Sequence, residues 1–303
     1  MNTNLTPEQQ AEIDALRDAP RQTLRAVAEG MERHLYIAHP VLDHGFVRVV
    51  DYMGDDAAIC QAARVSYGRG TKSVQNDEGL IRYLMRHWHS TPFEMCEVKL
   101  HVKLPVFVAR QWIRHRTANV NEYSARYSIL DREFYIPAPE QLAAQSSVNN
   151  QGRGEVLQGD EARRVLDLLR EDAMRSYDHY EAMLSQDGQQ GLARELARMN
   201  LPANIYTQWY WKTDLHNLLH FLRLRADAHA QYEIRAYAEA MCGIVADWVP
   251  AAFAAFRDYR MEAASLSAQA VAVLRRRLAG ETVTHADSGM SAREWREFEE
   301  VWG

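Results

Sequence analysis

Residues 96–104, CEVKLHVKL, predict a β-strand that leads directly into an α-helix. Apolar and polar residues alternate here with a period of two, which places one set on each face of a sheet. The apolar set is Val98, Leu100, Val102 and Leu104. Pro105 follows, and proline suits the first turn of a helix because no backbone N–H is needed there. We therefore expect a half-buried strand that ends in a helix carrying Arg110, Gln111 and Arg114.

The residues that continue this helix, RQWIRHRTANVNEYSARY at 110–127, are dense in polar side chains. They include four arginines, one histidine, two asparagines, one glutamate and one serine. Arginine presents a fixed fork of donors that suits phosphate or carboxylate, so this density favours an anionic ligand with several attachment points. A solvated helix end is the alternative. Asn119 and Asn121 favour a turn, and Ser124, Arg126 and Ser128 at period two predict one side of an extended segment.

Elsewhere the sequence predicts a strand over 45–54 and several helices. The helices are expected at 55–67, 80–88, 161–184, 191–199, from about 205 into the 230s, and 231–259 with a break at Pro250. Residues 145–160 are rich in Gln, Asn, Ser and Gly and predict a surface loop. Helical extensions are expected at 1–43, where Thr6 caps Pro7, and at 261–303, where Ser291 and Glu294 form a capping box. The central domain is then 44–260.

Composition favours a cytoplasmic globular protein. The chain has 303 residues, 47% hydrophobic and 25% charged, with a net charge of −6 that gives no general attraction to nucleic acid or anionic membranes. The opening residues lack the basic start and apolar run of a secretory signal, and no stretch approaches the ~18 apolar residues of a membrane span. Three widely spaced cysteines fit a reducing compartment and not a disulfide framework.

Three chemical alternatives arise from shorter patterns. His216 and His220 have the spacing of two zinc ligands on a helix, but the HExxH glutamate is missing and Arg223 shares their face, so we expect no metal. Ser124 has His115 nearby in sequence, but it lacks the glycine-flanked elbow of a nucleophilic hydrolase. The aromatic residues between the arginines could stack on nucleic acid, yet the basic residues do not follow a long face; these aromatics are Trp112, Tyr123 and Tyr127.

A resemblance to a known family accounts for these pieces together. Arg114-His115-Arg116, followed after seven residues by Ser124, matches RHRx7S, the signature of flavin-dependent thymidylate synthases. Further matching segments are AARVS at 62–66, HSTPFE at 89–94, FVARQWIRHR at 107–116, EFYIP at 133–137 and LRADAHAQYEIR at 224–235. The resemblance covers about 44–259 and leaves out the first forty residues, the insertion near 150 and the C-terminal tail.

The resemblance implies an α+β fold with a central sheet flanked by helices, and a methyltransferase of dTMP biosynthesis. Such an enzyme methylates dUMP with methylenetetrahydrofolate and NADPH by way of FAD, as a homotetramer with sites between subunits. The residues expected at dUMP are Gln111, Arg114, Glu122, Tyr123, Ser124, Ala125, Arg126, Arg198 and Arg225. Those expected at FAD are Ser66, Thr91, Glu94, Arg114, His115, Arg116, Asn121, Glu122, Asp214, His216, His220, Leu224 and His229.

Two residues are expected in catalytic roles: Arg225, facing the uracil ring, and His89, near flavin and folate. A cation against the N3/O4 edge favours the electron-rich ring whose C5 attacks a one-carbon unit. No cysteine lies in the signature, and the family route needs no enzyme nucleophile, so Ser124 is expected to bind substrate. Some family members have asparagine or arginine where this chain has Asp214, His216 and His220.

On a continuous helix, Asp214, Arg225 and His229 share one face, and His216, His220 and Arg223 lie opposite. One pocket could hardly use both faces. The arrangement therefore predicts a helix shared between two sites at a subunit interface.

Overall fold

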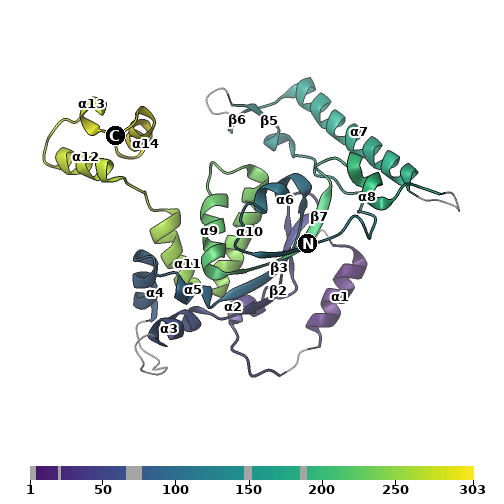
Figure 1. Ribbon diagram of the computed structural model, residues 1–303, viewed down its shortest axis with the longest axis horizontal. Helices are drawn as coiled ribbons and strands as arrows, with labels where there is room; N and C mark the ends of the chain where they lie inside the picture. Colours follow the sequence, from purple (N-terminus) through teal and green to yellow (C-terminus); the bar gives the residue numbers. More distant parts are fainter. Residues whose placement is uncertain (1–4, 20–21, 66–76, 147–151, 185–189) are drawn as a thin grey trace. The chain divides into compact units, whose positions relative to one another are not determined.

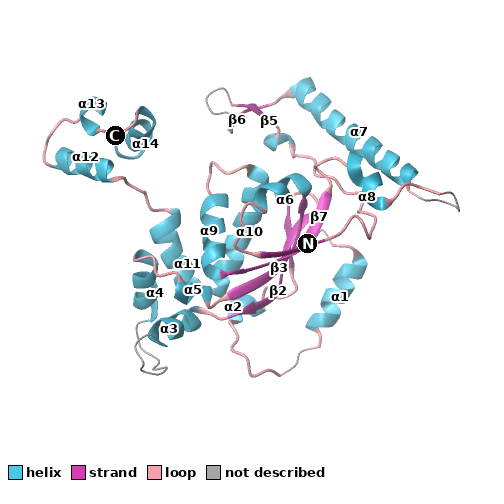
Figure 2. Cartoon of the chain, viewed as in Figure 1, coloured by secondary structure: helices cyan, strands magenta, loops and turns pink. Residues whose placement is uncertain are grey.

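The strand expected over 96–104 forms the centre of a five-stranded antiparallel sheet. It is β3 (Glu97–Pro105), and its apolar residues at alternate positions are at most 2% exposed. The strand order is β1 (Ala38–Val41), β2 (Gly45–Met53), β3, β7 (Tyr206–Asp214) and β4 (Asn119–Glu122). Every pairing in this sheet is antiparallel, with Leu100 opposite Trp211 at the β3–β7 contact. Figures 1 and 2 show these strands beside the helices of the same unit.

The computed structural model describes residues 5–19, 22–65, 77–146, 152–184 and 190–303. The chain divides into two compact units, Met1–Phe256 and Arg257–Gly303. Strand β1 pairs with β2 in the sheet, so the division that we expected at residue 43 separates two paired strands. No helix among the described residues is long and apolar enough to cross a membrane.

Three helices pack against the sheet and enclose an aromatic core: α6 (Val106–Trp112), α9 (Leu215–Arg225) and α10 (Tyr232–Trp248). Trp112 lies at the centre of this core. Its ring stacks on Phe221 with centroids 4.6 Å apart, and it meets Trp209 and Trp211 edge-on. Because buried aromatic rings contribute large apolar area, this core fixes the end of α6 against α9.

The remaining elements of the first unit form two further groups. One consists of α3 (Asp56–Val65), α4 (Asp77–Arg86), α5 (Thr91–Glu94) and α11 (Pro250–Phe256), which pack on one another and on α9. The other consists of η1 (Pro139–Gln141), the hairpin β5 (Ala143–Gln145) and β6 (Arg153–Val156), α7 (Gly159–Met183), α8 (Arg194–Ala197) and η2 (Arg198–Asn200). Phe134, Tyr177 and Tyr180 are central to its apolar cluster.

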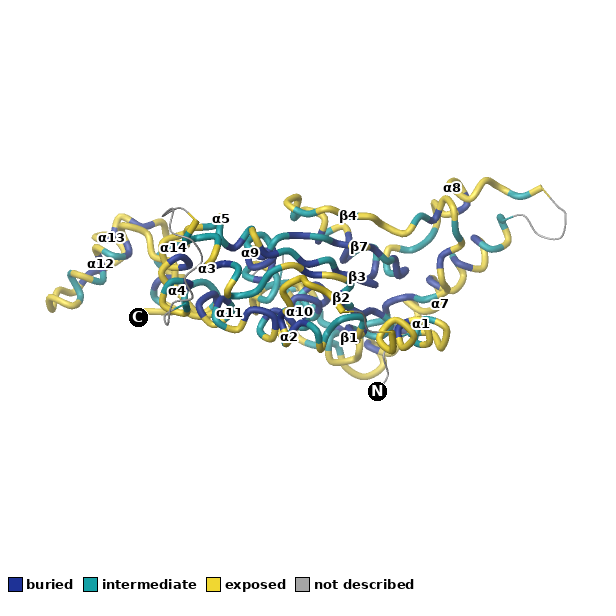
Figure 3. The backbone as a smooth tube through the Cα atoms, turned by 90° about the horizontal axis from the view of Figure 1, so that it is seen from below, coloured by how far each residue is buried: buried dark blue, intermediate teal, exposed yellow. Residues whose placement is uncertain are grey.

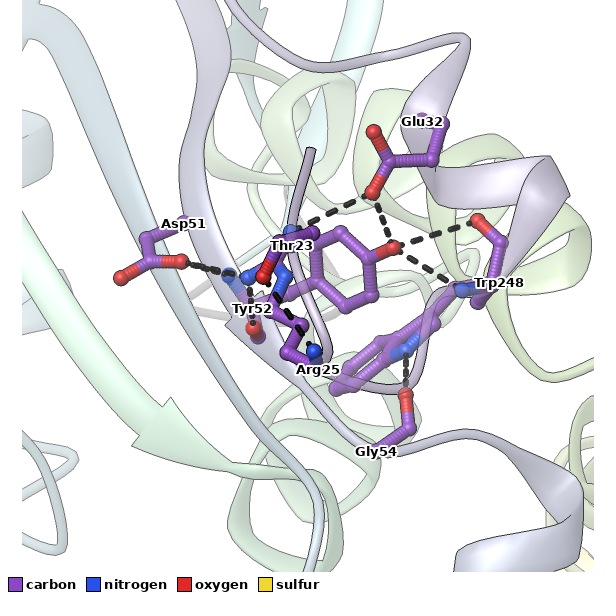
Figure 4. A network of polar contacts seen from close by, with 8 residues as sticks. Thr23, Arg25, Glu32, Asp51, Tyr52, Gly54 and Trp248 are labelled. Carbon is purple, nitrogen blue, oxygen red and sulfur yellow. Dashed lines mark hydrogen bonds and ion pairs between the residues drawn. The ribbon is translucent and has the colours of Figure 1, made fainter. Parts of the chain in front are cut away.

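The N-terminal segment, with α1 (Pro7–Arg17) and α2 (Glu29–Glu32), is tied to β2 by a polar network (Figure 4). The Arg25 guanidinium lies over the Tyr52 ring at 4.6 Å and donates to Glu32 at 3.2 Å. The Tyr52 hydroxyl donates to the same carboxylate and accepts from the backbone N–H of Ala28. Burial and the Glu32 carboxylate raise the pKa of Tyr52 to about 12, so this hydroxyl remains protonated.

The second unit contains η3 (Arg257–Met261), α12 (Ala268–Leu278), α13 (His285–Ser288) and α14 (Ala292–Trp302). Its own apolar cluster contains Val273, Met290 and Phe298. Arg277 lies over the rings of Trp295 and Phe298 and pairs with Glu299.

Several local expectations are confirmed. Asp55 accepts from the N–H of Ala58 at the start of α3, Thr6 and Gln9 form a full capping box, and Pro250 separates α10 from α11. At α14 only half of the expected capping box forms. Ser291 accepts from the N–H of Glu294, but the Glu294 carboxylate accepts from Ser267 instead.

The expectations for residues 206–214, 119–122 and 124–128 are wrong. Residues 206–214 form β7 and not the first part of a helix, because this strand buries Trp209 and Trp211 on one face against α6 and α9. Residues 119–122 form an edge strand and not a turn, since the edge of β7 supplies their backbone partners. Residues 124–128 form a turn, in which the N–H groups of Tyr127 and Ser128 donate to the Ser124 carbonyl, and not an extended segment.

Candidate active site at the end of α6

His115 lies where α6 ends against α9. Its ring meets Phe221 edge-on, with centroids 5.0 Å apart, and lies 5.8 Å from the His220 ring. Burial, then the charge of Arg225, then His220 lower the pKa of His115 to about 4. The imidazole is therefore neutral at pH 7, with one nitrogen that donates and one that accepts.

Two buried polar atoms, one on α6 and one at the end of α9, point to a ligand. The Arg225 Nε and the Gln111 Oε1 are buried and have no hydrogen-bond partner within the described part of the chain. Burial also lowers the pKa of Arg225. Buried donors and acceptors are almost always paired, because an unpaired one loses its bonds to water without replacement. A polar ligand at the end of α6 can supply both partners.

The signature serine lies in a turn that follows the edge strand β4. Backbone pairing places Glu122 opposite Trp209, and the Tyr123 N–H donates to the Gln208 carbonyl at 2.7 Å. The Glu122 carboxylate accepts from the Thr207 hydroxyl at 2.9 Å. The edge of β7 thus fixes both the backbone and the carboxylate that lead into the turn at Ser124.

The turn also contacts α8. Arg126 pairs with Glu195 at 3.1 Å, and Arg194 donates to the carbonyl of Tyr127 at 2.6 Å. Arg198 begins η2, directly after α8. The structure therefore brings Ser124, Arg126 and the segment of Arg198 together, although about seventy residues separate them in sequence.

His89 precedes α5, the short helix that carries Thr91 and Glu94. Its ring stacks with Tyr83 at 5.9 Å, and Tyr83 also contacts His87 at 4.4 Å. Helix α5 packs against α9. The HSTPFE segment is therefore placed beside the helix of His216 and His220.

Helix α9 differs from the continuous helix that we expected. Asp214 is its N-cap and accepts from the N–H of Asn217, while His229 lies beyond its end in a turn, 3.0 Å from Asp227. The sequence placed Arg225 and His220 on opposite faces of this helix, yet both lie close to His115. The helix is shorter and His115 lies over Phe221, between them on the helix surface, so both act on the same imidazole.

Most of the expected ligand residues are accessible in this single chain (Figure 3 shows β4 as exposed). The exposed ones are His89, Thr91, Arg114, Arg116, Asn121, Glu122, Tyr123, Arg126, Arg198, His220, Leu224 and His229. Those of intermediate exposure are Glu94, Gln111, His115, Ser124, Asp214, His216 and Arg225, and Ala125 is buried. Ser66 lies outside the described residues.

The donor set fits a nucleotide and a flavin better than a metal. The arginine guanidinium groups and the amide groups of glutamine and asparagine at the ends of α6 and β4 are suited to bind phosphates and ring carbonyls. Among the described residues, no group of three or more His, Cys, Asp or Glu side chains could hold a metal ion.

The sequence patterns missed the residues that support the site. Phe221 supports the His115 ring, and Arg194 and Glu195 hold the turn around Ser124. Phe221 occupies an ordinary apolar position of α9, so its helical spacing was the available signal. Nothing in the sequence linked residues 194–195 with 126–127, because only the fold brings them together.

Comparisons with known proteins show the family. A family model described as thymidylate synthase complementing protein matches residues 48–251. The chain is 80% identical over 299 residues to a flavin-dependent thymidylate synthase of Ruegeria pomeroyi, covering 99% of each chain. It is 66% identical over 297 residues to one of Gluconobacter oxydans, covering 98% of each.

A solved structure supports the fold. The UMP/dUMP methylase PolB from Streptomyces cacaoi, bound with 5-Br UMP, is similar with a TM-score of 0.65 and 32% identity. The match covers 72% of this chain and 95% of that one. The chain therefore belongs to the flavin-dependent thymidylate synthases, the α+β enzymes that methylate dUMP to dTMP with methylenetetrahydrofolate, NADPH and FAD.

Proposed function

We propose that this chain performs the thymidylate synthase reaction where α6 ends, between the turn at Ser124 and helix α9. The observation that carries the proposal is the buried Nε of Arg225, which has no hydrogen-bond partner among the described residues and lies close to the neutral His115. A guanidinium in a partly desolvated place interacts strongly with a ligand that develops negative charge.

Arg225 activates the substrate ring in this proposal. Uracil C5 is a poor nucleophile, and a cation at the N3/O4 edge favours the electron-rich form that attacks a one-carbon unit. FAD, when bound, supplies the relay of the hydride from NADPH. His115 stays neutral beside Arg225, so it adds no second positive charge and can donate or accept a hydrogen bond.

The nucleotide is positioned by side chains from three elements. Gln111 comes from α6 and Arg114 from the segment directly after it, Ser124 and Arg126 come from the turn, and Arg198 comes from η2. Charge-assisted bonds from arginine to phosphate fix orientation as well as affinity. Glu122, Tyr123 and Ala125 complete the dUMP site.

The flavin site is assigned to a second set of residues, which shares Arg114 and Glu122 with the dUMP site. Its members are Ser66, Thr91, Glu94, Arg114, His115, Arg116, Asn121, Glu122, Asp214, His216, His220, Leu224 and His229. His89, stacked on Tyr83 before α5, is assigned to the flavin and folate end.

Arg225→Ala tests the catalytic assignment. We expect dTMP formation to fall by at least about a hundredfold, because an electrostatic contact to the reacting ring is lost, while FAD remains bound. Activity is measured as dTMP formed and FAD binding by absorption. Arg110→Ala removes an exposed arginine on α6 and should leave both unchanged. Wild-type turnover in Arg225→Ala would refute the assignment.

We also infer a homotetramer with sites completed between subunits. The support is that Arg114, Arg116 and Arg198 are exposed in one protomer, as are the apolar side chains of Tyr127 (75%) and Met199 (71%) close to the turn. A second copy would cover these apolar groups and desolvate the arginines.

Sedimentation should give a tetramer, and mixing two inactive variants tests whether a site is shared. Arg198→Ala and Arg225→Ala protomers, refolded together, should regain part of the activity if the two residues act from different subunits. A monomer in sedimentation, or no regained activity in mixed assemblies, would contradict the shared site.

A further inference from the structure

A buried carboxylate begins helix α10. Glu233 is 3% exposed, and three side chains donate to it. The Tyr135 hydroxyl donates to Oε1 at 3.0 Å, and Nε2 of Gln231 donates to Oε2 at 2.9 Å. Nη2 of Arg153 lies 2.6 Å from both carboxylate oxygens. A buried carboxylate is tolerated only when donors or a cation compensate its charge, and Arg153 is the cation here.

Arg153 comes from β6, within the stretch that its polar composition predicted to be a surface loop. The structure gives it a defined place: its Nη1 donates to the carbonyl of Gln141 at 3.1 Å, and its guanidinium lies over the Tyr232 ring at 5.8 Å. The hairpin β5–β6 is thereby attached to the first turn of α10.

Glu233 in turn holds the end of the turn at 226–231. Gln231, the N-cap of α10, donates to Glu233, and Arg235 donates to the carbonyl of Ala228 at 2.7 Å. This turn follows Arg225 directly and carries His229. The position of both side chains therefore depends on how firmly the first turn of α10 is held.

We propose that Arg153 is a positioning residue for this active site: it neutralises Glu233 and so holds the 226–231 turn that places Arg225 and His229. This inference rests on the proposed function, which gives those two residues their roles at the substrate and the flavin. Arg153 contacts Glu233 and acts only through it.

The charges around Glu233 predict the effect of removing Arg153. Burial by itself would raise the pKa of Glu233, but the hydrogen bonds from Arg153 and Gln231 outweigh it, so the pKa lies below its usual value. Tyr135 donates to Glu233 without a charge. The Arg235 guanidinium lies over the Tyr232 ring at 5.9 Å but pairs with Glu239 at 3.4 Å, so among the described residues Arg153 is the cation bonded to Glu233. Without Arg153 the buried carboxyl therefore takes up a proton more easily, and its ionised form is unfavourable.

The test compares Arg153→Met, Arg153→Lys and the double variant Arg153→Met/Glu233→Gln. Binding of FAD to the full chain is followed by flavin fluorescence from pH 6 to 9, and amide hydrogen exchange is followed over 226–231. In Arg153→Met, FAD affinity should fall on the order of tenfold at the alkaline end and less toward pH 6, because a proton taken up by Glu233 removes the unpaired charge. Exchange over 226–231 should rise in parallel.

The other two variants separate charge from packing. Arg153→Lys keeps a cation and should retain most of the affinity. The double variant has no carboxylate to neutralise and should return to within about twofold of the wild type at alkaline pH, since the neutral amide that replaces the carboxylate can still accept from Tyr135. Loss of affinity at every pH, with no recovery in the double variant, would show that Arg153 acts through packing alone and would overturn the proposal.

The outcome is distinguishable from failure of the proposed function. If Arg225→Ala abolishes dTMP formation while Arg153→Met behaves as wild type, only the positioning role fails. If Arg225→Ala keeps full activity, the catalytic assignment fails whatever Arg153 does.

Discussion

Single residues at points of close approach limit what the first unit can accommodate. A Cβ atom added at Gly30 would lie 1.7 Å from the backbone oxygen of Asp247, so α2 touches α10 through a residue that has no side chain. At Gly45 the same atom would lie 2.0 Å from the hydroxyl of Tyr237. Both glycines allow buried backbone to pack where any larger residue would separate the elements.

Gly30→Ala should destabilise the protein. The contact at 1.7 Å is to backbone oxygen, so α2 must move away from α10, and we expect a loss of about 2–3 kcal/mol from overpacking. Denaturant unfolding measures this. Gly243→Ala is the matched control. Gly243 lies on α10, the helix that Gly30 contacts, and a Cβ atom added there would have no neighbour within 4 Å. It should stabilise by about 0.5–1 kcal/mol, and equal effects of the two changes would contradict the steric explanation.

His101 predicts how stability depends on pH. Burial, then the charge of Arg48, lower its pKa to about 4, although a hydrogen bond to Gln208 opposes the shift. The unfolded chain binds a proton near pH 6.5 and the folded one does not, so stability is complete above about 6.5 and falls as pH decreases toward 4.

His101→Gln should remove this part of the acid loss. The wild type should lose up to about 1.4 kcal/mol per pH unit between 6 and 4.5 from this residue, and the variant should show a correspondingly flatter slope. Unfolding free energies across pH 4.5–8 provide the measurement, with pH 8 giving the difference due to packing alone. Parallel slopes would show that His101 is protonated equally in both states.

Among the elements, β7 is the one on which the site depends most. One face carries Trp209 and Trp211 into the aromatic core that positions α6, and its edge supplies the backbone partners of β4. The same strand thus supports both the core beneath His115 and the strand β4 that leads to Ser124. A polar segment as short as β4 forms a strand only because β7 offers an edge to pair with.

Thr207→Val tests this link between β7 and the substrate site. It removes the hydroxyl that donates to Glu122 at 2.9 Å and keeps the side-chain shape. We expect dUMP binding about three- to tenfold weaker, because one hydrogen bond contributes about 1 kcal/mol. Thr207→Ser keeps the hydroxyl and should bind dUMP as the wild type does. Calorimetric titration measures the dUMP affinity of the three proteins. Unchanged affinity in Thr207→Val would show that the Thr207–Glu122 hydrogen bond does not contribute to dUMP binding.

On the scale of the whole molecule, the chain is two units with separate cores. The first contains the sheet and all the described residues assigned to the site, and the second, Arg257–Gly303, has Phe298 at 5% exposure in its own cluster. Because each unit has its own apolar core, one unit can unfold while the other stays folded.

Phe298→Ala should destabilise the second unit alone. Removing a buried aromatic ring costs about 3–5 kcal/mol, which exceeds what so small a core can lose. Hydrogen exchange should rise over 268–302 and stay unchanged over 97–105. Val102→Ala, in the buried centre of β3, should give the opposite pattern. Faster exchange in β3 of the Phe298→Ala protein would show that the two units unfold together.

Local sequence patterns identify the family, the reaction and the central strand. RHRx7S and its flanking segments specify one chemistry, and the alternation at Val98, Leu100, Val102 and Leu104 has one interpretation because side chains in a strand point to alternate faces. Local signals of this kind also predicted the caps at Thr6 and Asp55. They depend on residues only a few positions apart, so no tertiary contact is needed to interpret them.

Contacts between distant segments establish β7, β4 and the surroundings of Arg225. Trp209, Trp211 and Thr213 occupy alternate positions, which is a strand pattern. The helical pattern that follows in α9 led us to predict a helix here, and only the packing of the tryptophan rings between the sheet and its helices shows the strand. The pairing of Asn119–Glu122 with β7, of Arg126 with Glu195 and of Arg153 with Glu233 joins distant segments. Such contacts form because burial brings the partners together, and burial is a property of the whole fold that no short stretch of sequence contains.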